Sequence, residues 1–227
     1  MPALRSLSSR RLAVFVLLAG LSLLVVAMVA IRVSYTGDAT YANLVWNLFL
    51  AWVPLGLALV VYDGARRRLR GLWLATFAGL WLLFFPNAPY LLTDFIHLDE
   101  GPAPLWYDAL MLSAFAWTGL LLGFASLYLV QMVLRRALGS RLAWVAAAGA
   151  LALASVGVYI GRFIRFNSWD ALLHPLRVAD VIQEQLTGVP LRMAGALLGL
   201  TAFLLVGYLA VYSFTDLRLE LEQEEDR

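Results

Sequence analysis

The chain has 227 residues, of which 62% are hydrophobic and 14% charged, and its mean hydropathy is +0.80. These values exclude an ordinary soluble protein and indicate one integral membrane domain over residues 1–227. The absence of cysteine excludes disulfides and thiolate metal sites, and a net charge of +2 without a basic tract argues against a nucleic-acid partner.

Six apolar runs have the length and composition of membrane-spanning helices. They cover residues 12–31, 41–62, 72–85, 109–133, 142–160 and 191–214. The expected fold class is therefore all-α, a polytopic transmembrane helical bundle of about six spans in a lipid bilayer.

The first run has a competing interpretation as a cleaved leader. Arg10 and Arg11 precede it, and residues 27–30 resemble a cleavage site. However, a run of about 20 apolar residues exceeds the usual leader core of about 7–15. We therefore expect an uncleaved anchor, and removing it would leave the orientation of the other spans unchanged.

The basic residues, all arginine, are distributed unevenly between the two sides of the predicted bundle. One side holds Arg5, Arg10, Arg11, Arg66, Arg67, Arg68, Arg70, Arg135, Arg136, Arg141, Arg218 and Arg227. The other side holds Arg32, Arg162, Arg165, Arg177 and Arg192. Because basic loops stay in the cytoplasm, this bias predicts a multi-pass protein of the cytoplasmic membrane with both termini inside. Residues 215–227 then form an acidic cytoplasmic tail.

The third run is too short to cross a bilayer as one helix. Its 14 residues span about 21 Å, whereas the hydrocarbon core is about 30 Å thick. Pro86 and Pro89 follow it and break regular helical geometry. The carbonyl groups freed by this break need partners, so the segment is expected to be buried or to line a polar pocket near the outer face.

Ionisable and polar side chains accumulate in the same predicted outer layer. The candidates for catalysis are Asp94, His97 and Asp108, and the candidates for substrate binding are Arg162, Arg165, Asn87, Asn47, Asn167, Trp169 and Asp170. In a helical turn, Asp94 and His97 are three residues apart and therefore share one face. Polar groups at membrane depth are costly unless they are paired, so these residues are expected to meet.

Several of these residues also have structural interpretations. Asp108 has the position of a helix N-cap, and Asn167 with Asp170 resembles a capping box. The aromatic residues of the layer, which are Tyr90, Trp106, Tyr107 and Trp169, suit an interfacial belt. Arg162 and Arg165 could form structural ion pairs with Asp94 and Asp108. His174 begins a predicted amphipathic helix on the outer face, with apolar residues at Val178, Val181, Ile182 and Leu186.

The motifs narrow the chemistry without identifying a cofactor. No strong metal signature accompanies Asp94 and His97, and no Gly-x-Ser-x-Gly elbow supports a serine nucleophile. The arginine pair is suited to holding a phosphate or carboxylate, and the carboxylates with His97 are suited to moving protons.

Three separated motifs carry a resemblance to a known family. They are residues 46–52 (WNLFLAW), residues 85–90 (FPNAPY) with Thr93, Asp94 and His97, and residues 159–170 (YIGRFIRFNSWD). Together they resemble the domain of unknown function 1361 family of bacterial polytopic membrane proteins, over about residues 41–212. This resemblance implies a membrane fold but no catalytic role.

The leading hypothesis is an enzyme that acts at the extracytoplasmic face on a lipid-linked or anionic substrate. Arg162 and Arg165 would hold the anion, and Asp94 or Asp108 would act as general base with His97 as proton partner. The alternatives are a small-solute or ion transporter and a non-catalytic membrane assembly factor. The substrate and the oligomeric state are left open by the sequence.

Overall fold

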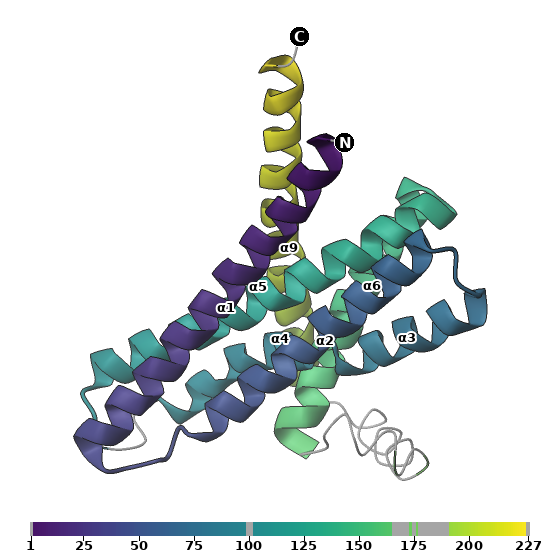
Figure 1. Ribbon diagram of the computed structural model, residues 1–227. Helices are drawn as coiled ribbons and strands as arrows, with labels where there is room; N and C mark the ends of the chain where they lie inside the picture. The colour runs from purple at the N-terminus through teal and green to yellow at the C-terminus, as the bar shows by residue number, and fades with distance from the viewer. Residues whose placement is uncertain (1, 99–101, 165–172, 174–175, 177–190, 226–227) are drawn as a thin grey trace.

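The computed structural model describes residues 2–98, 102–164 and 191–225, together with Leu173 and Leu176 (Figure 1). Every regular element in these ranges is helical. The elements are α1 (Pro2–Thr36), α2 (Asn43–Arg66), α3 (Gly71–Phe84), α4 (Asn87–Tyr90), the 3₁₀ helix η1 (Leu91–His97), α5 (Leu105–Leu138), α6 (Ser140–Tyr159), the π-helical turn η2 (Ile160–Ile164) and α9 (Leu191–Glu225).

Six stretches of these helices are long and apolar enough to cross a membrane, which confirms the predicted fold class. They are Leu12–Thr36, Asn43–Arg66, Gly71–His97, Leu105–Leu138, Ser140–Ile164 and Met193–Phe214. The predicted amphipathic helix after His174 lies outside the described residues.

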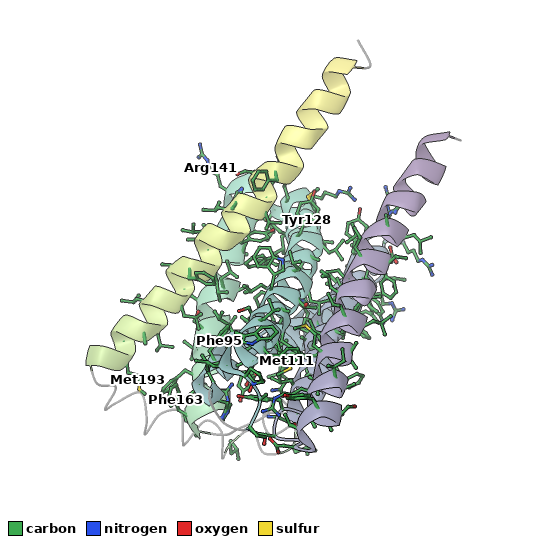
Figure 2. The ribbon with its side chains drawn as sticks, turned by 90° about the vertical axis from the view of Figure 1, so that its left-hand side faces the viewer. Phe95, Met111, Tyr128, Arg141, Phe163 and Met193 are labelled. Atoms are coloured by element: carbon green, nitrogen blue, oxygen red, sulfur yellow. The ribbon has the colours of Figure 1, made fainter. Side chains whose placement is uncertain are left out.

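Helix α5 forms the centre of the bundle. Its buried face includes Met111, Phe115 and Leu122, which pack with residues of α1 and α2, and further along Leu127, which packs with residues of α6 and α9. Helices α1 and α9 flank the remaining helices and expose large apolar side chains such as Leu23 and Leu198 (Figure 2). Such exposure suits helices that face lipid rather than water.

The start of α5 corrects one prediction from the sequence. Asp108 is not the N-cap, because α5 begins at Leu105 after Pro104 and Asp108 lies within the first turn. Pro104 has a φ of −58°, which suits a helix start, and its carbonyl accepts hydrogen bonds from the N–H groups of Tyr107 and Asp108 at 2.9 and 3.3 Å. The carboxylate of Asp108 does not cap α5 and instead accepts hydrogen bonds from Arg32.

The predicted break of the third span is confirmed at Phe84, where α3 ends. Pro89 cannot donate a hydrogen bond to the carbonyl of Phe85, which instead accepts one from the N–H of Ala88 at 3.2 Å. The side-chain amide of Asn87 donates to the carbonyl of Phe84 at the end of α3, with Nδ2 at 2.9 Å from the oxygen.

Glycines let the neighbouring helices approach this break closely. A Cβ atom on Gly157 of α6 would lie 2.4 Å from Cγ of Pro86, and one on Gly119 of α5 would lie 2.5 Å from the carbonyl oxygen of Ala88. By contrast, a Cβ on Gly149 would meet nothing within 4 Å. The break is therefore held between α5 and α6.

The two ends of the bundle differ in their polar residues. We call one the Asp94 end, where the α1–α2 connection, η1, the start of α5 and η2 lie. We call the other the arginine end, where the α2–α3 and α5–α6 connections lie (Figure 1). At the arginine end, Gly139 alone connects α5 to α6, with a φ of +85° that favours glycine.

Candidate functional site

The 3₁₀ helix η1 directs Asp94 and His97 toward the same partner. In a 3₁₀ helix, residues three apart lie above one another, so these two side chains share a face. Both contact the guanidinium of Arg162: Nη2 donates to Oδ1 of Asp94, and Nη1 lies 3.1 Å from Nε2 of His97. The predicted meeting of these residues is thus observed.

Two further contacts hold the guanidinium of Arg162. Its Nε donates to the hydroxyl of Thr93 at 3.0 Å, and its Cζ lies 4.5 Å from the ring centroid of Tyr90. The side chain retains 12% of its accessible surface, whereas that of Asp94 retains 1%. The network is therefore closed on the carboxylate side and partly open on the arginine side.

The position of Arg162 depends on the end of α6. There the chain widens into the π-helical turn η2, a distortion that occurs often at functional sites. The rings of Tyr159 and Phe163 pack at a tilt of 35° with centroids 5.1 Å apart, and Phe163 is exposed. These aromatic residues flank the turn from which Arg162 reaches η1.

Helix α2 contributes the third side of the site. Nδ2 of Asn47 lies 3.4 Å from Oδ2 of Asp94, so that both carboxylate oxygens have a donor. Asn47, Asp94 and Arg162 come from three different spans. We call Asn47, Thr93, Asp94, His97 and Arg162 the Arg162 network.

A second buried ion pair lies beside this network. Nε and Nη2 of Arg32 donate to the two oxygens of Asp108 at 2.7 and 3.2 Å, and both residues are 1% exposed. Nη1 of Arg32 also contacts Asp38 at 3.3 Å. Hydrogen bonds from Thr40, and then from Arg32, hold the pKa of the Asp38 carboxyl below its usual value despite partial desolvation.

Tyr41 connects the two ion pairs. Its ring lies beneath Arg32, with Cζ 4.4 Å from the ring centroid, and its hydroxyl donates to the backbone carbonyl of His97. Only 2% of Tyr41 is exposed. Tyr41 therefore contacts both Arg32 of one ion pair and the backbone of His97, which belongs to the Arg162 network.

Comparison with known sequences assigns the chain to a family. Residues 46–206 match the family described as protein of unknown function (DUF1361). The chain belongs to this family. It matches no curated protein and no solved structure.

The DUF1361 match covers all of the Arg162 network but not the whole second ion pair. Asn47, Asp94, His97 and Arg162 lie within residues 46–206, whereas Arg32 and Tyr41 precede them. The family description supplies no activity, so the site must be interpreted from its geometry.

The structure separates the residues proposed from sequence into three groups. Asn47, Asp94, His97 and Arg162 meet, whereas Asp108 belongs to the neighbouring pair and Asn87 bonds to the α3 terminus. The remaining candidates lie outside the described residues: Arg165, Asn167, Trp169, Asp170 and His174.

The sequence analysis gave Arg32 and Thr93 no place in the site, and it interpreted Tyr90 only as part of an interfacial aromatic belt. The signal for Arg32 was available, since a lone arginine near the end of an apolar span needs a buried partner, and Asp108 also needed one. Thr93 and Tyr90 carry no charge, and their contacts with Arg162 depend on the path of the chain after the break, where Tyr90 ends α4 and Thr93 lies in η1.

The described part of the chain contains no cluster of side chains suited to binding a metal ion. There, histidine, aspartate and glutamate side chains do not gather in a group of three or more that could hold an ion. The chemistry that the Arg162 network offers is anion binding and proton transfer.

Proposed function

We propose that this protein is an enzyme acting at the extracytoplasmic face of the cytoplasmic membrane on a lipid-linked or otherwise anionic substrate. The observation that carries the proposal is the contact of Arg162 with a buried carboxylate, a histidine nitrogen and a hydroxyl, while part of its side chain remains open. We further propose that this opening belongs to a polar pocket.

Arg162 is suited to exchange some of its partners for a substrate anion. Among the acceptors that contact it, Asp94 is charged, whereas the Thr93 hydroxyl and the His97 nitrogen are neutral and bind a guanidinium less strongly. An incoming phosphate or carboxylate would therefore displace the neutral acceptors first. Asp94 would stay in place and orient the guanidinium.

His97 is suited to accept a proton once the anion has bound. A guanidinium has only N–H donors, so Nε2 of His97 must offer its lone pair to Arg162, and the ring is then neutral with its proton on Nδ1. When the anion takes the Nη1 donor, Nε2 is released to accept a proton from a nucleophile. Asp94 would balance the positive charge that develops on the ring.

The general-base role fits Asp108 less well than His97 or Asp94. Both oxygens of Asp108 accept hydrogen bonds from Arg32, and the carboxylate is buried. A general base must contact the group from which it takes the proton, and this carboxylate is instead buried against Arg32. We therefore give Asp108 a structural role beside the site.

A transporter is supported less well by the contacts deeper in the bundle. Buried polar side chains there pair with each other, as Ser126 does with Nε1 of Trp81 at 3.2 Å and Gln131 with the hydroxyl of Tyr208. In the described part of the chain, such buried side-chain polar atoms have partners within the protein, whereas a solute path needs polar groups that are open to the solute. A non-catalytic assembly factor would not need a partly open arginine.

The proposal is tested by comparing membrane lipids and lipid-linked species by mass spectrometry in cells that lack or express the protein. Expression of the wild-type chain should lower one anionic pool and raise another. Arg162→Lys, which keeps the charge but loses the forked donors, and His97→Phe should both abolish the change. Arg141→Lys, a matched substitution of an exposed arginine, should not.

Membrane insertion of each variant is checked by quantifying the protein in purified membranes. Identical pools with and without the wild-type chain would contradict the proposal. So would a full change of the pools in cells that express inserted Arg162→Lys or His97→Phe protein.

A further inference from the structure

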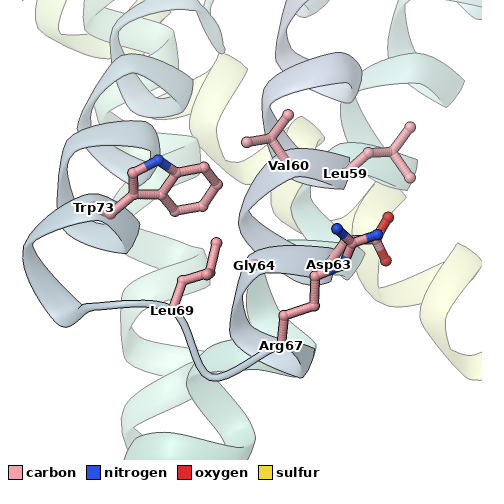
Figure 3. Close-up of a pocket in the computed structure, with 7 residues that line it drawn as sticks. All are labelled: Leu59, Val60, Asp63, Gly64, Arg67, Leu69 and Trp73. Carbon is pink, nitrogen blue, oxygen red and sulfur yellow. The ribbon is translucent and has the colours of Figure 1, made fainter.

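A groove at the arginine end touches none of the residues discussed as the site. Its volume is about 300 Å³, at the lower end of ordinary small-molecule pockets. It lies in the turn between α2 and α3. Its lining residues are Leu59, Val60, Asp63, Gly64, Arg67, Leu69 and Trp73 (Figure 3).

The walls of the groove are apolar and depend on Gly64. A Cβ atom at this position would lie 2.4 Å from Cζ3 of Trp73, so glycine allows the indole to lie against α2. Figure 3 shows Trp73 and Leu69 on one side of the groove and Val60 on the other. These surfaces suit the apolar part of an amphiphile.

The rim of the groove carries two opposite charges. Asp63 and Arg67 are four residues apart at the end of α2, which places them on the same face, and both are exposed. The backbone N–H of Arg67 donates to the carbonyl of Asp63 at 3.0 Å, so the helical geometry continues to Arg67. A ligand that uses both side chains must carry an anion and a cation close together.

The position of the groove between two membrane-spanning stretches suits contact with lipid headgroups. It joins the ends of two membrane-spanning stretches, Asn43–Arg66 and Gly71–His97. Phospholipid headgroups surround such a turn in any membrane. An aminophospholipid provides the required phosphate and amine next to an apolar chain.

We propose that this groove binds the headgroup of an aminophospholipid of the phosphatidylethanolamine type. Arg67 holds the phosphate, Asp63 accepts hydrogen bonds from the primary ammonium, and Trp73 with Leu69 packs against the adjoining apolar part. Phosphatidylcholine has no N–H to donate to Asp63. A purely anionic headgroup is disfavoured beside Asp63 and would be attracted by the exposed Arg66, Arg68 and Arg70 without entering the groove.

The test is native mass spectrometry of the purified full-length chain in micelles that contain equal amounts of phosphatidylethanolamine, phosphatidylcholine and phosphatidylglycerol. The wild-type protein should retain phosphatidylethanolamine about fivefold over phosphatidylcholine, as expected for one partly exposed charged contact. Asp63→Asn should remove this preference. Arg67→Gln should lower retention of both lipids.

The matched control is Arg70→Gln, which removes the same charge from the same turn at a residue outside the groove. It should leave the lipid preference of the wild-type chain unchanged. Equal retention of the two zwitterionic lipids, a preference for phosphatidylglycerol, or equal losses in Arg67→Gln and Arg70→Gln would each overturn the proposal. None of these outcomes depends on the proposed enzymatic function.

Discussion

At the scale of single residues, the two buried ion pairs impose the strongest constraints on the Asp94 end. Asp94, Arg32 and Asp108 are each 1% exposed, so removing the partner of any one of them leaves an uncompensated charge in a medium without water. The contacts made by Tyr41 then transmit the position of one pair to the other.

The Arg32–Asp108 pair should be replaceable as a unit but not one residue at a time. Arg32→Met leaves the Asp108 carboxylate buried without its partner, and we expect a loss of about 3–5 kcal/mol in the free energy of unfolding. Arg32→Met combined with Asp108→Leu should recover most of that loss. Unfolding in mixed micelles measures both values.

Arg32 also contacts Asp38 at 3.3 Å, and both variants lose this contact, so their difference in stability reports on Asp108. The carboxylate of Asp38 is partly exposed and can be solvated when the arginine is absent. If the double variant is no more stable than Arg32→Met, the prediction that the Arg32–Asp108 pair can be replaced as a unit is wrong.

At the scale of elements, the broken third span connects packing to the site. The helix is interrupted at Pro86, and after the single turn α4, which contains Pro89, the chain continues as the 3₁₀ helix η1, in which Asp94 and His97 share a face. Close contacts with α5 and α6 hold the break in place. The orientation of η1 therefore depends on glycines that lie outside the Arg162 network.

Gly157→Ala should destabilise the protein, because the new Cβ would lie 2.4 Å from Cγ and 2.7 Å from Cβ of Pro86. We expect a loss of about 1–3 kcal/mol in the free energy of unfolding, typical of overpacking. Gly149→Ala on the same helix meets nothing within 4 Å and should be neutral or slightly stabilising. Thermal unfolding of both variants compares them, and equal melting temperatures would contradict the packing account.

The sequence predicted the membrane-spanning helices better than it predicted which side chains contact each other. Apolar length predicted six spans, and the proline pair predicted the break after residue 85, because both signals are local. The pairing of Asp108 with Arg32 joins residues 76 positions apart, and it required knowing which helices are neighbours. The amide of Asn87 donates to the terminal carbonyl of α3, a local contact that the sequence did not predict, and its expected role in substrate binding stays a prediction.

At the scale of the whole molecule, the two ends of the bundle differ in their charged residues. The arginine end holds exposed Arg66, Arg67, Arg68, Arg70 and Arg141 and the groove between α2 and α3. The Asp94 end holds the two buried ion pairs. This division is the basis for proposing that the Arg162 network faces away from the cytoplasm.

The proposed orientation can be measured directly, because the chain has no cysteine of its own. Ala39→Cys places a thiol in the exposed α1–α2 connection, and Ser140→Cys places one beside the α5–α6 connection. A membrane-impermeant maleimide added to intact cells should label the first variant, and the second only after permeabilisation. The reverse pattern would place the Arg162 network on the cytoplasmic side.

The meeting of the third and fifth spans at Asp94 and Arg162 is tested most directly by a double-mutant cycle with Asp94→Asn and Arg162→Gln. Because the two side chains form an ion pair, we expect the double variant to lose less stability than the sum of the losses in the two single variants. The difference, which is the coupling free energy, should be roughly 1–3 kcal/mol. Unfolding free energies that add to within about 0.3 kcal/mol would show that the two residues do not interact and would contradict the site.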